Sequence, residues 1–315
     1  MTRMPELPAA ASALMAPVVN GPRRSGLVVA SFPTCVYAVL DDPDLPASQR
    51  LVALVGPGAL LLPGAMRLAT ARSAGGWASG SVGDAVVVGS GVVELPGWSA
   101  RMVRVWQPPR VRCRGSAATG DQAARPAGEW GSVLEPLAQA DVAPHLVTRA
   151  AAFTAAALRG GSVAETLRPL VGAGPGLTPS GDDAVCGALL VLHGLGRPVP
   201  ASGLDSAVDR TTSLSAALLA AAHHGYAVPE VVRLVDAVLD AVLDVHAEGN
   251  DALRASLPDV FAIGHSSGRD LVAGVVGALR AWTAVRSAAP PASDYRTVIR
   301  LGRRPAHRFT EGCGP

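Results

Sequence analysis

The hydrophobic pattern of this chain changes near residue 115, and this change constrains the fold more than any other feature. Residues 26–114 contain short runs rich in Val and Leu, separated by Gly and Pro. Such runs are typical of β-strands joined by turns, and Gly89-Ser90-Gly91 suits a hairpin. Further along, apolar residues recur at helical spacing, most clearly over 231–245. The sequence therefore predicts an α+β protein, in which an N-terminal β-rich, barrel-like domain precedes a mainly α-helical domain.

Composition along the chain suggests where the domains begin and end. The apolar stretch at the N-terminus is broken by prolines and a glutamate, which favours a poorly ordered leader over an export signal. A Gly/Ala-rich segment in the middle reads as a linker, and the Pro/Arg-rich end as a loosely held tail. We therefore expect a leader at 1–25, a β-rich domain at 26–114, a linker at 115–131, a helical domain at 132–285 and a tail at 286–315.

The charged and sulfur-containing residues exclude several classes of function. The formal net charge is only +2 and the basic residues are scattered, so we expect no nucleic-acid partner. No apolar run approaches membrane-spanning length, so we expect no membrane association. All 27 basic residues are arginine, which excludes a pyridoxal phosphate Schiff base and a Walker-type phosphate loop. The four cysteines lie far apart, as expected for free thiols in a reducing cytoplasm.

A glycine- and proline-rich segment at 174–183, GPGLTPSGDD, stands directly before an apolar run. Ser180 has the position of a helix N-cap, and Asp183 has the spacing that closes a capping box. By itself this spacing indicates no more than a rigid turn leading into a capped helix.

A second segment repeats this pattern. Residues 180–187 and 267–274 both read S-G-x-D-x-x-x-G, and each leads into an apolar helix with a glycine one turn later. Glycine inside a helix costs about 1 kcal/mol relative to alanine, so its use in both helices suggests a close helix crossing. We expect Gly187 to lie near Gly274 and both helix N-termini to face one space.

Two helix N-termini facing one space would favour an anion such as phosphate or carboxylate. Asp182, Asp183 and Asp270 would add carboxylates of the kind that bind Mg²⁺, and His265 would add a titratable group. Three carboxylates beside an anion need a compensating charge, which Mg²⁺ or the guanidinium of Arg269 would supply. The hydroxyls of Thr211, Thr212 and Ser215 either cap a helix or contact the same ligand.

The segments GAGPGLTPSGDD, RTTSLS and IGHSSGRD together resemble a bacterial family of unknown function that includes the oxamate carbamoyltransferase subunit of allantoin catabolism. The resemblance extends over roughly 146–280 and is weaker over the β-rich part. It implies other protein subunits as partners and small anions, carbamoyl phosphate and oxamate, as ligands. The matching positions are Gly174, Pro175, Gly176, Thr178, Ser180, Asp182, Asp183, Thr211, Thr212, Ser215, His265, Ser266, Ser267 and Asp270.

Three functions remain open at this point. The chain is a subunit of a carbamoyltransferase-type enzyme, a non-catalytic anion-binding or scaffold subunit, or a metal-dependent hydrolase. The candidate catalytic residues are Asp183, Asp270 and His265. The candidate ligand-binding residues are Gly174, Gly176, Thr178, Ser180, Gly181, Asp182, Thr211, Thr212, Ser215, Ser266, Ser267 and Gly268. The candidate metal ligands are Asp182, Asp183 and Asp270, with Mg²⁺ as the expected ion.

Overall fold

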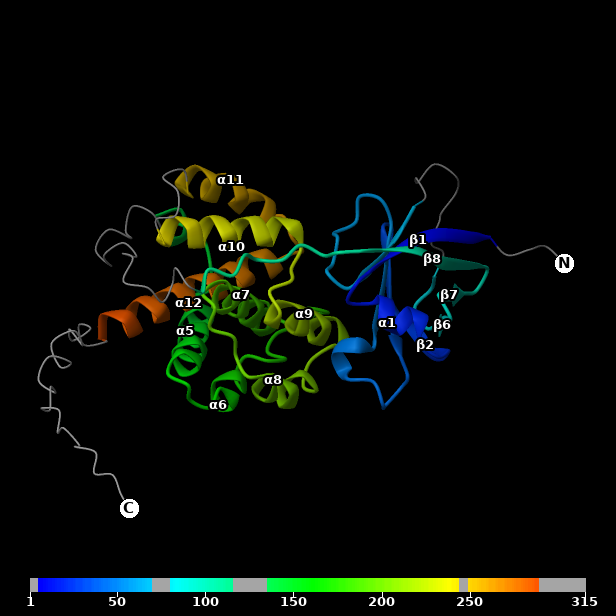
Figure 1. Cartoon of the computed structure of the whole chain (residues 1–315), viewed down its shortest axis with the longest axis horizontal. Coiled ribbons are helices and arrows are strands. Elements are labelled where there is room, and N and C mark those ends of the chain that lie inside the picture. Colours follow the sequence, from blue (N-terminus) through cyan, green and yellow to red (C-terminus); the bar gives the residue numbers. More distant parts are fainter. Residues whose placement is uncertain (1–4, 70–79, 116–134, 244–248, 289–315) are drawn as a thin grey trace, which may run out of the picture.

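The computed structural model describes residues 5–69, 80–115, 135–243 and 249–288. Within these ranges a β-barrel comes first and a group of helices follows, and the two parts lie at opposite ends of the molecule (Figure 1). The predicted α+β architecture is therefore confirmed. The expected linker at 115–131 and the expected tail at 286–315 fall almost entirely outside the described residues.

Within the described part of the chain, eight strands close into a barrel in the order β1-β5-β4-β3-β2-β6-β7-β8. Neighbouring strands are antiparallel, except that β1 runs parallel to β8 and β4 runs parallel to β5. The expected hairpin at Gly89-Ser90-Gly91 joins β6 to β7. The strands are β1 Glu6–Ser12, β2 Arg24–Phe32, β3 Cys35–Leu40, β4 Leu51–Val55, β5 Ala65–Leu68, β6 Ala85–Gly89, β7 Val92–Leu95 and β8 Trp98–Trp106.

The first strand lies where the sequence suggested a poorly ordered leader, so that prediction is wrong for residues 5–25. β1 pairs with both β5 and β8, and the short helix α1 (Ala16–Asn20) follows it. Alanine and proline are both poor strand formers, and Pro8 lies inside β1. Pairing on both edges of the strand overrides these local preferences. The barrel also ends at Trp106, earlier than the predicted boundary at residue 114.

The helices follow the barrel in sequence. α7 lies in the middle of the helical part and is buried on nearly all sides, and α12 packs against both α5 and α7. No helix in the described ranges is long and apolar enough to cross a bilayer. The helices are α4 Glu135–Ala138, α5 Pro144–Leu158, α6 Ala164–Leu167, α7 Ser180–Gly194, α8 Ala201–Val208, α9 Ser213–His223, α10 Pro229–Val242, α11 Gly249–Phe261 and α12 Ser267–Ala288.

The two faces of strand β3 belong to two different cores. Val36 and Ala38 point into the barrel, where they pack with the other interior side chains. Cys35 and Tyr37 lie on the opposite face and pack with residues of the helices. Successive side chains of a strand alternate between its faces. One face of β3 therefore contributes to the barrel interior, and the other face packs against the helices.

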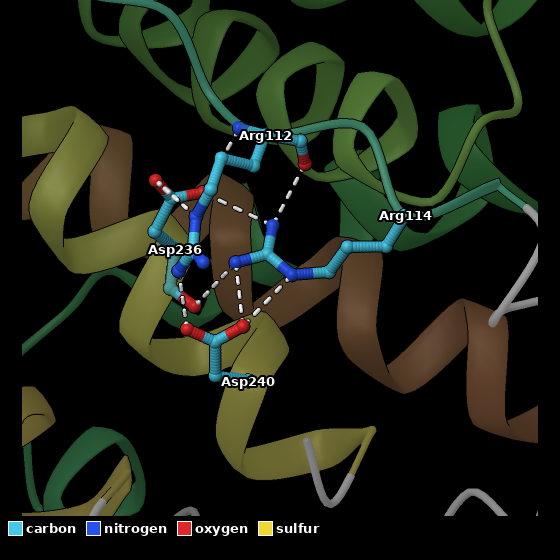
Figure 2. A network of polar contacts seen from close by, with 4 residues as sticks. All are labelled: Arg112, Arg114, Asp236 and Asp240. Carbon is cyan, nitrogen blue, oxygen red and sulfur yellow. Dashed lines mark hydrogen bonds and ion pairs between the residues drawn. The ribbon is translucent and has the colours of Figure 1, made fainter. Parts of the chain in front are cut away.

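The segment between β8 and the helices is held on α10 by a network of charges (Figure 2). The Arg114 guanidinium lies 2.7 Å from an Asp240 oxygen and 3.0 Å from an Asp236 oxygen. Arg112 also reaches Asp240, at 2.5 Å, and its amide donates to Asp236. The predicted β-rich domain extends to residue 114, but beyond a single bridge at Arg110 the segment 110–114 pairs with no strand. It acts instead as a strap that ties the barrel to the helices.

Candidate functional site

Glycines shape the loop that precedes α7. Gly174 and Gly176 have φ angles of 128° and 89°, which L side chains rarely adopt. A Cβ at Gly174 would also lie 2.7 Å from the amide nitrogen of Ser180. The amide of Gly181 donates to the carbonyl of Ala173 at 2.9 Å, so the loop folds back onto the helix start. These glycines are therefore required for the backbone conformation of the loop.

The predicted capping box at the start of α7 does not form. The N-cap of this helix is Pro179, and no side chain caps it. The amides of Asp182 and Asp183 both donate to the Pro179 carbonyl. The backbone thus satisfies the first turn, and the carboxyl of Asp183 is left for other contacts.

Asp182 holds the loop in place, and both of its carboxylate oxygens are engaged. Oδ1 accepts from the amide of Gly172 at 2.8 Å, and Oδ2 accepts from the hydroxyl of Thr211. The neighbouring Thr212 donates its hydroxyl to the carbonyl of Leu177 at 2.5 Å. The two threonines and Asp182 therefore position the loop between them.

Helices α7 and α12 cross with their backbones in contact, as the repeated glycines predicted. A Cβ on Gly187 would clash with the carbonyl of Leu271, and one on Gly274 would clash with the carbonyl of Ala184. The glycines after the two serines act similarly: Gly181 lies against the carbonyl of Leu170 and Gly268 against that of Val260. Both copies of the S-G-x-D-x-x-x-G pattern are therefore used in the same way, and they bring the two helix starts together.

Two buried carboxyls meet at this junction. Asp183 and Asp270 are 6% and 7% exposed, and the Oδ2 atom of each lacks a hydrogen-bond partner. The pKa of Asp183 is raised from 3.8 to about 8, chiefly by burial and also by the charges of Asp270 and Asp182, although a hydrogen bond from Ser267 lowers it in part. At neutral pH Asp183 is therefore largely protonated, and its hydroxyl is a hydrogen-bond donor.

Most first-turn amides of the two helices already have partners. In α7 the amides of Gly181, Asp182 and Asp183 donate to protein carbonyls, and in α12 those of Gly268 and Asp270 do the same. The expected cradle of free N–H groups is therefore largely used up by the protein. A ligand at this junction would depend on side-chain donors.

A cavity of about 440 Å³ opens between the barrel and the helices at this junction. Its polar end is formed by Thr178, Asp183 and Ser267, and the hydroxyls of Thr178 and Ser267 lie 2.9 Å apart. Apolar side chains form most of the remaining wall. Those from the barrel side are Phe32, Leu60, Leu62 and Pro63, and those from the helices are Leu177, Leu190, Leu214, Leu218, Ala222, Ala227, Val228, Val231, Ile263 and Leu271.

The other predicted site residues lie outside the cavity wall. His265 and Ser266 are exposed, as are Gly174 and Gly176, and none of them lines the cavity. Ser215 is buried and donates its amide to the capping hydroxyl of Thr212, but its own hydroxyl has no partner. Of the fifteen predicted site residues, the cavity is lined by Thr178, Asp183, Ser267 and Gly268, and Asp270 is near enough for its charge to raise the pKa of Asp183.

The carboxyls at the junction do not fit a resident magnesium ion. Among the described residues, no group of three or more His, Cys, Asp or Glu side chains is arranged to hold a metal. Both oxygens of Asp182 already accept a hydrogen bond, and Asp183 is buried beside a mostly apolar cavity wall. Mg²⁺ requires several ionised or carbonyl oxygens in near-octahedral geometry, so we assign it no role here.

Sequence reasoning missed the barrel side of the cavity. Cys35 and Tyr37 both line it from strand β3, together with Phe32, whose ring meets that of Tyr37 edge to face with centroids 5.9 Å apart. A signal was present in the sequence, because Cys35 and Tyr37 fall on one face of a strand. No local sequence pattern, however, indicates that this face meets the starts of α7 and α12.

One comparison with known proteins bears on this site. Residues 170–279 match the family model described as oxamate carbamoyltransferase subunit AllH. No curated protein and no solved structure shows significant similarity to the chain. The matched segment contains the loop before α7 and the start of α12, which form the polar end of the cavity, and the threonines before α9, which hold that loop in place.

Proposed function

We propose that this chain is a subunit of a carbamoyltransferase-type enzyme of allantoin catabolism, and that the cavity at the start of α7 and α12 binds its small anionic acceptor. The family match supports the enzyme class, because it covers the elements that form the polar end of the cavity. The observation that carries the site assignment is the carboxyl of Asp183, which is buried, lines the cavity and has an oxygen without a partner.

A protonated Asp183 would not repel an anionic ligand. Ionised carboxylates beside an anionic ligand would repel it, whereas a neutral carboxyl donates a hydrogen bond to it. The hydroxyls of Ser267 and Thr178 lie beside this group, and because they hydrogen-bond to each other, they add one further donor between them. In carbamoyl transfer, negative charge develops on the carbamoyl oxygen, and fixed donors in a site shielded from water stabilise that charge. Asp183 and Ser267 are the groups that we assign to this role, and burial, together with the charge of Asp270, keeps Asp183 protonated.

The residues that line this cavity also favour the binding of a singly charged acceptor such as oxamate. None of the described residues that line it is Arg, Lys or His. A phosphate dianion in such surroundings would lack any neutralising charge. We therefore assign the phosphate of carbamoyl phosphate to another subunit, which is consistent with a family named as a subunit.

A second candidate is a non-catalytic binding subunit, and one observation favours it. Burial and the charges of Asp183 and Asp182 raise the pKa of the Cys186 thiol, so the thiol on the cavity wall stays protonated and is a poor nucleophile. His265, the expected proton carrier, is exposed and lies outside the wall. In this alternative the chain presents the acceptor while a partner subunit supplies the chemistry.

The proposal places the chain in the cytoplasm. Cys35, Cys113 and Cys186 are free thiols among the described residues, which supports a reducing compartment.

Calorimetric titration of the purified chain with oxamate tests the site. We expect oxamate to bind the wild type, Asp183→Asn to retain binding within about tenfold because an amide can also donate, and Asp183→Leu to lose it. Asp205→Asn, an exposed aspartate on α8, is the matched control. Equal binding by wild type and Asp183→Leu would show that Asp183 is not part of the site.

An assay of carbamoyl transfer from carbamoyl phosphate distinguishes the two candidate functions. It is run with the chain alone and then with its partner subunits. Activity of the chain alone would indicate a catalytic subunit, and activity only with the partners would favour a binding subunit.

A further inference from the structure

The cavity is much larger than the polar junction at its end. Its volume is about 440 Å³, within the range of roughly 300–1,000 Å³ that is typical of sites for drug-sized ligands. Oxamate, a carboxylate joined directly to a carboxamide, would occupy the polar end and leave most of this space unfilled. A well-matched ligand for such a site is a larger molecule.

The unfilled part has apolar walls on both sides. Leu190, Leu214 and Leu218 line it from α7 and α9, and Leu60 and Leu62 line it from the barrel side. Apolar walls of this kind gain free energy when they exclude water against an apolar group. A small polar anion offers no such group, whereas a hydrocarbon chain or an aromatic ring does.

Two apolar side chains of the wall also reach the surface. Phe32 is 44% exposed and Leu60 is 37% exposed, although both line the cavity. They therefore mark its mouth, on the barrel side. The carboxyl of Asp183, whose Oδ2 atom has no hydrogen-bond partner, lies at the start of α7 and marks the polar end. A ligand that enters past Phe32 would thus present its polar head to Asp183 and leave its body between the leucines.

We infer that this cavity binds an amphipathic molecule: a carboxylate–amide head at Asp183 and Ser267, carrying an alkyl or aryl body that fills the apolar chamber between α7, α9 and the barrel. The inference rests on the proposed function for the position of the head. It goes further in assigning an N-substituted oxamate, or a compound of the same class, as a better ligand than oxamate itself.

Calorimetric titration with oxamate, N-butyloxamate and N-phenyloxamate tests the inference. Each buried methylene should tighten binding by about fourfold, so N-butyloxamate should bind at least about tenfold more tightly than oxamate. Ala222→Leu narrows the chamber and should weaken the binding of N-butyloxamate more than that of oxamate. Because this variant adds bulk to a buried position, Leu218→Ser serves as a second one, which should reduce the gain from the butyl group without adding volume.

The outcomes separate this inference from the proposed function. If oxamate binds and the butyl and phenyl groups add no affinity, the inference is overturned and the proposed function stands. If the butyl group adds affinity but Asp183→Leu weakens neither probe, the assignment of the head to Asp183 is overturned and the apolar chamber stands. If none of the three probes binds, both are overturned.

Discussion

The hydroxyl oxygens of Thr178 and Ser267 lie 2.9 Å apart and join the loop before α7 to the first residue of α12. These residues are 89 positions apart in the sequence, yet they form one edge of the cavity. Ser267 also hydrogen-bonds to the carboxyl of Asp183 and lowers its pKa in part. One hydroxyl therefore both connects the two helix starts and tunes the buried acid.

Ser267→Ala should raise the pKa of Asp183 further above its value of about 8, because the hydrogen bond that favours the ionised form is lost. Thr178→Val, which removes the outer hydroxyl of the pair, should move this pKa less. The pKa is measured by following the carboxyl carbon of Asp183 by NMR as the pH is varied. A lower pKa in Ser267→Ala would contradict the arrangement described here.

The buried carboxyl of Asp183 should make stability depend on pH. Its pKa is about 8 in the folded protein against 3.8 for the free group. Between these values the folded protein holds a proton that the unfolded chain releases, so this group favours folding most at low pH. Its contribution falls by about 1.4 kcal/mol per pH unit as the pH rises, and the fall ends above the folded pKa.

Asp183→Asn isolates this effect, because the amide does not titrate. The free energy of unfolding of wild type minus that of Asp183→Asn should therefore decrease from about pH 4 to about pH 8 and be constant above that range. Urea denaturation of both proteins across this range gives the difference, in which the titration of all other groups cancels. Parallel stability curves would show that Asp183 is ionised in the folded protein.

Gly187→Ala and Gly274→Ala should each destabilise the protein by about 1–3 kcal/mol or more, because each new Cβ meets backbone atoms of the opposite helix. Gly64→Ala is the matched control, since a Cβ there has no atom within 4 Å, and it should change stability by about 0.5 kcal/mol or less. Thermal unfolding measures all three. Equal midpoints for the crossing and control variants would contradict a backbone contact.

Arg114→Met should cost about 3–5 kcal/mol, because the side chain of Arg114 is only 8% exposed and its loss leaves Asp240 buried without its main partner. Arg112 contacts the same two aspartates (Figure 2), but its side chain is 58% exposed. Arg112→Met should therefore cost about 1 kcal/mol or less. Urea denaturation gives both values, and similar losses for the two variants would show that burial does not decide the strength of this network.

The sequence alone predicted the helix crossing well and the polar end of the cavity in part. Gly187 and Gly274 were identified because glycine is costly inside a helix and occurs at the same place in two similar segments. Thr211 and Asp182, which the sequence predicts as ligand contacts, hydrogen-bond to each other and position the loop. Hydroxyls and carboxylates that position a loop have the same sequence pattern as those that bind a ligand. The apolar chamber was missed, because its wall combines strand β3 with α7 and α9, and no local pattern reports which distant faces meet.

The backbone contact between α7 and α12 has a consequence for how this protein can evolve. Since main-chain atoms set the separation of the two helix starts, that separation does not depend on which side chains line the cavity. The leucines of the chamber can therefore be replaced one at a time, and the preferred ligand can change with them. The relative position of Asp183 and Asp270 would stay the same. Lineages that share the glycines should thus diverge in substrate without diverging in the geometry around Asp183 and Asp270.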